Sequence, residues 1–196
     1  MAEPLSLAFS YIFTYQVHYN SMHQYQFPIE SERLSFRYFQ EADIAEWAVF
    51  FTENIMMHYV GATNPEAPEL EAKKFIERQT NRYKTDGFGT LAAIEKASGK
   101  IVGSAGIIYR QHPEFDKMHE IGYSVIPSRW GKGYATEMAR CFFDYFVAQK
   151  LANKVISIID EHNTASQKVA VNNGMQRGPK FNFNGFQCYQ YYRNID

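Results

Sequence analysis

The stretch Pro127-Ser-Arg-Trp-Gly-Lys-Gly-Tyr-Ala-Thr-Glu137 joins a predicted strand to a predicted helix, and the rest of the chain is best interpreted around it. Before it, His119-Glu-Ile-Gly-Tyr-Ser-Val125 has the composition of a strand. After it, residues 136–149 place large apolar side chains at helical spacing. The stretch is therefore predicted to form a turn at the N-terminus of a helix.

This turn has the features of an anion-binding site. The first N–H groups of a helix have no intrahelical partner, and the helix dipole is positive at that end. Gly131 and Gly133 carry no Cβ, so a phosphate can approach the main chain closely. The alternative is a connection whose glycines only relieve backbone strain. The stretch has neither a P-loop pattern nor the third glycine of a dinucleotide fingerprint, so we expect another ligand with a diphosphate.

Length and composition indicate one globular domain with a small-molecule or protein-amine substrate. The chain has 196 residues, of which 45% are hydrophobic and 21% charged, and its net charge is −1. Its basic residues are scattered, so neither nucleic acid nor a membrane is an expected partner. Cys141 and Cys188 lack metal-ligand spacing, and no metal site is expected. This cysteine usage favours a cytoplasmic protein.

Residues 1–28 differ in composition from the rest, because they are rich in aromatic residues and contain no Lys or Arg. A signal peptide is not favoured, since Glu3 is acidic and no positive segment precedes the apolar run at 5–13. Three interpretations remain: an ordered arm, a disordered leader, or translation upstream of a native start at Met22. So many aromatic residues favour the arm, packed on the fold or on a second subunit. We predict an N-terminal extension at 1–28 and a single domain at 29–196.

The order of predicted elements indicates a mixed α+β fold built on one mainly antiparallel sheet. About seven strands and about four helices are expected, with a tight turn at 96–99 and a loop at 111–116. The expected strands are 33–39, 89–95, 100–110, 119–125, 154–159, 175–181 and 186–193. The expected helices begin near 40, 69, 136 and 164.

This order, with this turn at its centre, resembles the GNAT superfamily of acyl-CoA-dependent N-acetyltransferases, and within it the RimJ/RimL-like branch of ribosomal-protein α-N-acetyltransferases. The likeness extends from about residue 29 to the C-terminus. It rests on Ile29-Glu-Ser-Glu-Arg-Leu-Ser-Phe-Arg37 as the opening strand, Glu120-Ile-Gly-Tyr-Ser-Val125, Trp130-Gly-Lys-Gly-Tyr-Ala-Thr-Glu137, and Asn163-Thr-Ala-Ser166 followed by Asn173-Gly-Met175. The resemblance implies a GNAT-like fold.

The resemblance also implies acetyl-CoA as co-substrate, with its pyrophosphate on the turn. In the superfamily pattern Arg/Gln-x-x-Gly-x-Gly/Ala, Gly133 and Ala135 match, whereas Trp130 stands where Arg or Gln is usual. In relatives the backbone of the preceding strand binds pantetheine and polarises the thioester carbonyl. The cofactor-binding residues implied in this way are Tyr123, Val125, Trp130, Gly131, Lys132, Gly133, Tyr134, Ala135, Thr136, Asn163 and Ser166.

Glu120 and Ser166 are the candidate catalytic residues. A carboxylate at 120 can accept the proton of the amine, directly or through water, while the alternative is a structural ion pair. His119 lies on the opposite face if the strand alternates. The tyrosine acid of many relatives corresponds to Ala170 and is therefore absent. Ser166 matches a serine of the RimJ/RimL-like branch that can bond the CoA sulfur; helix capping is the alternative for Ser166 and for Asn163.

Together these features predict an N-acetyltransferase that moves an acetyl group from acetyl-CoA to a primary amine by direct transfer in a ternary complex. Holding the amine and the thioester carbon in attack geometry supplies most of the catalysis. The acceptor is either a protein N-terminus or a small amine, such as a polyamine, an amino acid derivative or an antibiotic. The alternative function is a non-catalytic acyl-CoA-binding sensor or scaffold, which the residues at Trp130 and Ala170 favour. A homodimer is an open possibility.

Overall fold

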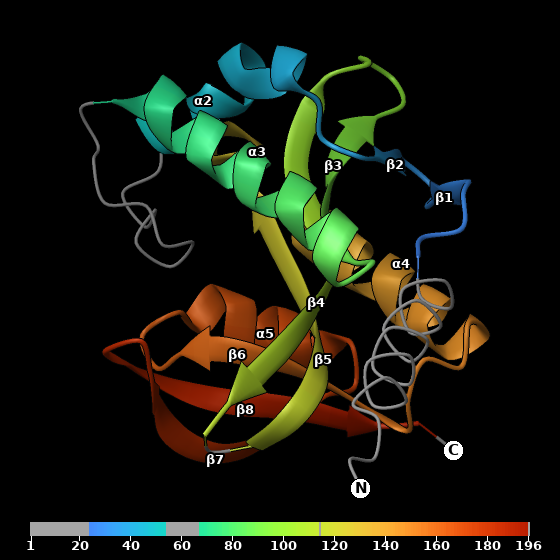
Figure 1. The fold of residues 1–196 in the computed structure, drawn as a ribbon, viewed down its shortest axis with the longest axis vertical. Helices are drawn as coiled ribbons and strands as arrows, with labels where there is room; N and C mark the ends of the chain where they lie inside the picture. The colour runs from blue at the N-terminus through green and yellow to red at the C-terminus, as the bar shows by residue number, and fades with distance from the viewer. Residues whose placement is uncertain (1–23, 54–66, 114, 196) are drawn as a thin grey trace, which may run out of the picture.

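The computed structural model describes residues 24–53, 67–113 and 115–195. These residues form one eight-stranded sheet in the order β1-β2-β3-β4-β5-β6-β8-β7 (Figure 1). The strands are β1 (Ile29–Glu30), β2 (Leu34–Arg37), β3 (Gly89–Glu95), β4 (Ile101–His112), β5 (Phe115–Val125), β6 (Lys154–Asp160), β7 (Gln176–Phe183) and β8 (Phe186–Asn194). The α-helices are α2 (Ile44–Glu53), α3 (Pro68–Thr85), α4 (Tyr134–Ala148) and α5 (Thr164–Asn172).

The predicted fold class is confirmed, with one strand more than the seven expected. Residues 29–37 do not form one opening strand, because β1 folds back antiparallel on β2 and pairs Ile29 with Phe36. The prediction of a loop over residues 111–116 is also wrong. There β4 continues to His112 and β5 begins at Phe115, so the two strands form a long antiparallel hairpin. Pro113 and the polar residues around it have loop composition, which hid the ends of both strands.

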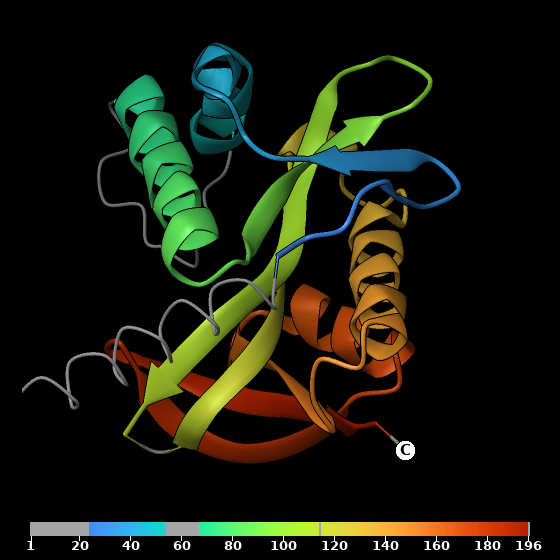
Figure 2. The same ribbon diagram turned by 45° about the vertical axis from the view of Figure 1, so that its right-hand side comes forward.

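The helices cover the two faces of the sheet, with α2 and α3 on one face and α4 and α5 on the other (Figure 2). The α4 face is apolar because Met138, Phe142 and Phe146 recur at helical spacing and are fully buried. On the opposite face, Trp47 of α2 lies 5.3 Å from the ring of Phe75 in α3. Both helical stripes follow the apolar periodicity of the sequence.

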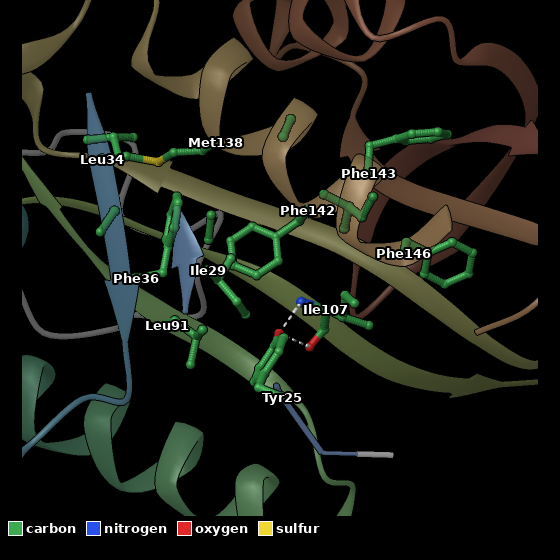
Figure 3. Close-up of a cluster of buried hydrophobic side chains, with 14 of the residues drawn as sticks. Tyr25, Ile29, Leu34, Phe36, Leu91, Ile107, Met138, Phe142, Phe143 and Phe146 are labelled. Atoms are coloured by element: carbon green, nitrogen blue, oxygen red, sulfur yellow. Dashed lines mark hydrogen bonds between the residues drawn. The ribbon is translucent and has the colours of Figure 1, made fainter. Parts of the chain in front are cut away.

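The side chain of Tyr25 closes the core between β3 and β4 (Figure 3). Its hydroxyl donates to the carbonyl oxygen of Gly89 at 2.7 Å and accepts from the N–H of Ile107 at 2.6 Å. Its ring packs edge-on against Phe88 and Phe142. Of the described residues 24–28, Tyr25 therefore packs on the sheet, and the rest of the predicted 1–28 extension lies outside the described residues.

We expect Tyr25→Phe to destabilise the protein by about 1–3 kcal/mol, because it leaves two buried main-chain groups without their partner. The free energy of unfolding in urea measures this change. Tyr145→Phe is the matched control, since the hydroxyl of Tyr145 accepts an exposed N–H from Gln26 that water can satisfy. Equal losses in both variants would contradict the structural role of the Tyr25 hydroxyl.

Candidate functional site

The pairing between β5 and β6 ends early and leaves part of the β5 backbone facing away from a strand partner. The parallel ladder has two pairs, His119 with Val155 and Glu120 with Ile156. Beyond them, the carbonyl oxygen of Ile121 accepts a hydrogen bond from the hydroxyl of Ser157 at 2.8 Å. Because main-chain groups alternate in direction along a strand, the N–H and C=O of Tyr123 point to the same side. The structure thus places Tyr123 where the two strands diverge.

The backbone of the predicted turn has the geometry that its glycines allow. A short 3₁₀ helix (Pro127–Arg129) follows β5, and Gly131 and Gly133 then adopt φ of 74° and 79° before α4 begins. Gly133 is the N-cap of α4, and no side chain caps this helix end. A Cβ added to Gly131 would meet no atom within 4 Å, so the space beside the turn is open. The start of α4 can therefore offer its N–H groups to an anion.

The indole of Trp130 ties the turn to the end of β5. Its Nε1 donates to the carbonyl oxygen of Val125 at 2.7 Å, and half of its surface is exposed. This bond occupies the carbonyl of Val125, so only the N–H of Val125 remains for a ligand on that side. The Trp130 side chain thus supports the turn from within.

Arg33 and Glu137 clamp the turn against the start of β2. The guanidinium of Arg33 donates to the carbonyl oxygen of Lys132 at 3.0 Å and to the carboxylate of Glu137 at 2.7 Å. The hydroxyl of Ser31 also donates to Glu137 at 2.7 Å. Burial by itself raises the pKa of Glu137, but the hydrogen bonds from Ser31 and Arg33 and the charge of Arg33 outweigh it and lower the pKa.

The side chain of Tyr134 contacts Glu95 and Arg33. Its hydroxyl hydrogen-bonds the carboxylate of Glu95, and the guanidinium of Arg33 lies 4.3 Å from the centre of its ring. The bond to Glu95 raises the pKa of Tyr134. The side chain of Tyr134 is buried, so its backbone N–H is the group that remains for a ligand.

The N-terminus of α5 lies beside the diverging part of β5. The side-chain oxygen of Asn163 accepts from the N–H of Ser166 at 3.1 Å, so Asn163 is the N-cap of α5. The hydroxyl of Tyr123 donates to the carbonyl oxygen of Ser166 at 3.0 Å. Burial raises the pKa of Tyr123, which keeps its hydroxyl protonated. Ser166 is half-buried, and its side chain interacts with the hydroxyl of Tyr123, which partly offsets the effect of burial on the Tyr123 pKa.

Glu120 lies on the last β5–β6 pair, with its side chain on the α2–α3 face of the sheet. It is 6% exposed and forms an ion pair with Arg110 of β4. The ring of His119 packs instead against Phe88 and Phe146, on the α4 face. Glu120 and His119 therefore lie on opposite faces of the sheet, as expected. Glu120 also forms the ion pair that is the alternative to a catalytic role.

The position of the missing tyrosine acid is part of the core. Ala170 is 2% exposed and packs with Ile159, Met175 and Tyr191. No proton can be donated from the Ala170 side chain. In the same region the side-chain amide of Asn173 donates to the carbonyl oxygen of Thr136 at 3.4 Å, which joins α5 to the first turn of α4.

Most of the residues singled out from the sequence lie along one line, from Glu120 through the β5 backbone to the start of α4, with Asn163 and Ser166 across from Tyr123. Sequence reasoning missed Arg110 and Arg33. Arg110 faces Glu120 only because of the β4–β5 register, and that register depends on a tight hairpin turn where the sequence predicts a longer loop. Arg33 meets Glu137 across 104 residues of sequence.

The residues that the structure describes hold no group of three or more His, Cys, Asp or Glu side chains suited to a metal ion. None of the helices in these residues has the length and apolar character needed to cross a membrane.

Comparison with known sequences places the site within a recognised domain. The model of the acetyltransferase (GNAT) domain family matches residues 33–176. The uncharacterized protein YkkB of Bacillus subtilis is 29% identical over 147 residues, which cover 74% of this chain and 83% of YkkB. The uncharacterized N-acetyltransferase YoaA of the same organism is 26% identical over 77% of this chain and 84% of its own length.

Solved structures share the fold at lower sequence identity. An acetyltransferase from Agrobacterium tumefaciens superposes with a TM-score of 0.69 at 21% identity, covering 88% of this chain and 96% of its own. The ribosomal-protein-S5-alanine acetyltransferase from Vibrio fischeri gives 0.65 at 17% identity, with coverages of 87% and 98%. The microcin C7 self-immunity acetyltransferase MccE, solved with acetyl-CoA and AMP, gives 0.67 at 16% identity, with coverages of 84% and 93%.

The hydrogen bonds of Glu137 with Arg33 and Ser31, which we call the clamp, predict how the stability of the protein depends on pH. Because the folded protein lowers the pKa of Glu137, the clamp contributes its full stability above the ordinary carboxyl pKa and loses it as pH falls through the lowered value. We expect Glu137→Gln to cost about 1–3 kcal/mol at neutral pH and to flatten the loss of stability in acid. Urea unfolding at a series of pH values measures both.

Glu77→Gln is the control for Glu137→Gln. Glu77 lies 4.0 Å from Lys73 on the exposed side of α3, where an ion pair contributes little. An unchanged pH profile for Glu137→Gln, or an equal loss for both variants, would contradict the role of the clamp.

Proposed function

This chain belongs to the GNAT family of acetyltransferases and is an acyltransferase enzyme, and we propose that it transfers an acetyl group from acetyl-CoA to a primary amine by direct transfer in a ternary complex. The observation that carries the proposal is the combination of two open backbone surfaces. These are the uncapped start of α4 and the diverging part of β5.

The turn fits the pyrophosphate of acetyl-CoA. Positive φ at Gly131 and Gly133 turns the chain so that several N–H groups precede the first turn of α4, and open space lies beside them. Main-chain groups of residues 130–136 would bind the phosphates, with the side chain of Lys132 exposed nearby. MccE, a protein of the same fold, was solved with acetyl-CoA, which supports acetyl-CoA as the ligand proposed for this chain.

The backbone of β5 would hold the pantetheine arm and the thioester. The N–H and C=O of Tyr123 and the N–H of Val125 face the divergence from β6, where an extended amide chain can take the place of the missing strand pairs. A main-chain N–H at this point would stabilise negative charge on the thioester oxygen as the amine attacks. Bound acetyl-CoA supplies an acyl group whose thiolate leaving group departs readily.

Glu120 would accept the proton that the attacking amine must lose. It lies at the closed end of the divergence, on the face opposite α4 and α5, and Arg110 orients its carboxylate. Ser166 is the candidate hydrogen-bond donor to the departing sulfur. Its half-buried side chain stands at the start of α5, next to the Tyr123 hydroxyl bond. We retain Asn163 as a pantetheine contact through its side-chain amide, in addition to its role as N-cap.

We also propose membership of the RimJ/RimL-like branch, supported by Ser166 and by the shared fold of the Vibrio fischeri enzyme. A cytoplasmic location is our inference from Cys141 and Cys188, which are both free thiols. A homodimer remains a prediction.

The first test is release of free CoA from acetyl-CoA in the presence of peptides and small primary amines. With an accepted amine, Glu120→Gln should lower kcat by about 10²–10⁴-fold while the affinity for CoA stays the same. Binding of CoA without turnover on any amine would overturn the proposed reaction and favour the non-catalytic binder, which Trp130 and Ala170 support.

The turn makes a separate prediction. Gly133→Ala places a Cβ at positive φ, which costs about 1–2 kcal/mol, and relief of that strain shifts the N–H groups that face the phosphates. We expect CoA affinity to fall about tenfold or more, as measured by calorimetry. Gly99→Ala is the matched control, because Gly99 has φ of 68° in the β3–β4 turn and a Cβ there would meet no atom within 4 Å. Equal affinity in the two variants would contradict the proposed phosphate site.

A further inference from the structure

Three arginines interact with one another on the α2–α3 face of the sheet, and two of them, Arg82 and Arg110, also interact with Glu120; we call Arg78, Arg82 and Arg110 the arginine cluster. Arg78 and Arg82 are four residues apart on α3, so they lie on the same side of that helix. Arg110 is on β4 and forms the ion pair with Glu120. Its guanidinium lies 5.3 Å from the ring centre of Phe183, which brings the β7–β8 hairpin to the other side of the cluster.

A chain of hydrogen bonds fixes α3 over this part of the sheet. Arg82 donates to the side-chain oxygen of Gln79 at 3.3 Å, and the same oxygen accepts from the N–H of Thr90 in β3 at 3.0 Å. The methyl group of Thr90 is directed at Gly122 of β5, since a Cβ on Gly122 would lie 3.7 Å from it. Gly122 and Glu120 are on the same face of β5. The arginines of α3 therefore stand over the same strip of sheet as the proposed base.

For Arg82, burial and the neighbouring positive charges outweigh the attraction of the nearby carboxylates. Glu120 attracts Arg82 and is bound to Arg110; Asp86 also attracts Arg82, and Glu71 attracts Arg78. Burial, with the charges of Arg110 and Arg78, still outweighs these carboxylates and lowers the pKa of Arg82 to about 10. Glu71 is itself paired with Lys74 at 3.0 Å. An added anion would therefore stabilise the charged guanidinium groups.

The site also holds a buried hydroxyl that has no hydrogen-bond partner in the described part of the chain. Thr90 is 6% exposed, and its hydroxyl has no hydrogen-bond partner among the described residues. A buried hydroxyl without a partner is costly in free energy, so a ligand group that bonds it is favoured. Thr90 lies between the Gln79–Arg82 pair and Gly122, at the centre of the strip.

We propose that the acceptor amine of this enzyme also carries an anionic oxygen group, a carboxylate or a phosphate, which binds the arginine cluster through Arg82 and Arg78 while its amine is directed at Glu120. This inference rests on the proposed function. Guanidinium groups bind such oxyanions through paired N–H donors. A polyamine, which brings only positive charge, is the acceptor that this arrangement disfavours.

The test compares acceptors that differ only in the anion. The pairs are leucine with isopentylamine, O-phosphoethanolamine with ethanolamine, and the C-terminally amidated dipeptides Ser-Glu and Ser-Gln, with spermidine added as the polyamine. For at least one pair, kcat/KM should favour the anionic member by about tenfold or more, which corresponds to about 1.4 kcal/mol. The pair that shows the preference identifies the anion as a free carboxylate, a phosphate or an acidic side chain.

Variants locate the preference in the cluster. Arg82→Gln should remove it by lowering kcat/KM for the anionic member alone, and Arg82→Lys should restore part of it. Arg78→Gln is a second variant, which leaves the Gln79 bond of Arg82 in place. Arg140→Gln, on the exposed side of α4, is the control and should leave the preference unchanged. The KM for acetyl-CoA should not change in any of them.

The outcomes distinguish failure of this inference from failure of the proposed acetyltransferase activity. Neutral amines accepted as well as their anionic partners, with no effect of Arg82→Gln, would overturn the inference and leave the acetyltransferase standing. Preference for spermidine would overturn it in the same way. No CoA release with any of these acceptors, or with the wider amine panel, would overturn the proposed reaction and the inference together.

Discussion

The early end of the β5–β6 ladder is the constraint on which the rest of the site depends. A sheet normally satisfies the backbone groups of its inner strands with neighbouring strands, and here that pairing ends at Glu120 and Ile156. The odd-numbered residues beyond Glu120 then turn their main-chain groups toward a side chain, as at Ile121 and Val125, or toward the divergence, as at Tyr123. An extended ligand can take the position of the absent strand, which couples the fold of the sheet directly to binding.

The starts of α4 and α5 lie near this divergence, and they differ in how they are capped. Asn163 accepts the N–H of Ser166 at the start of α5, whereas Gly133 leaves the start of α4 without a side-chain cap. An open helix start has a free-energy cost unless water or a ligand bonds it, and its loop tends to move. Here the loop is held from outside by Arg33 on Glu137 and from within by the indole of Trp130. Its geometry is thus set before any anion binds.

The sheet separates two chemical environments. The α4–α5 face carries the turn, Tyr123 and Ser166, which together suit a long polar donor molecule. The α2–α3 face carries Glu120 and the arginine cluster, which suit a small charged acceptor. Glu120 lies where the strands separate, so it is the acidic side chain at the junction of the two environments. Direct transfer requires such a junction, because the donor and acceptor must meet through the sheet.

The sequence by itself determined the helices, most of the strands and the glycine turn, because periodicity and positive-φ glycines are local properties that neighbouring residues express. It did not reveal β1, whose two residues are too few to show a period. Only the tertiary structure decided which side chains meet: Tyr25 with β3 and β4, Arg33 with Glu137, and Arg82 and Arg110 around Glu120. These contacts depend on strand register and helix placement, and those follow from packing of the whole core, to which residues far apart in sequence contribute together.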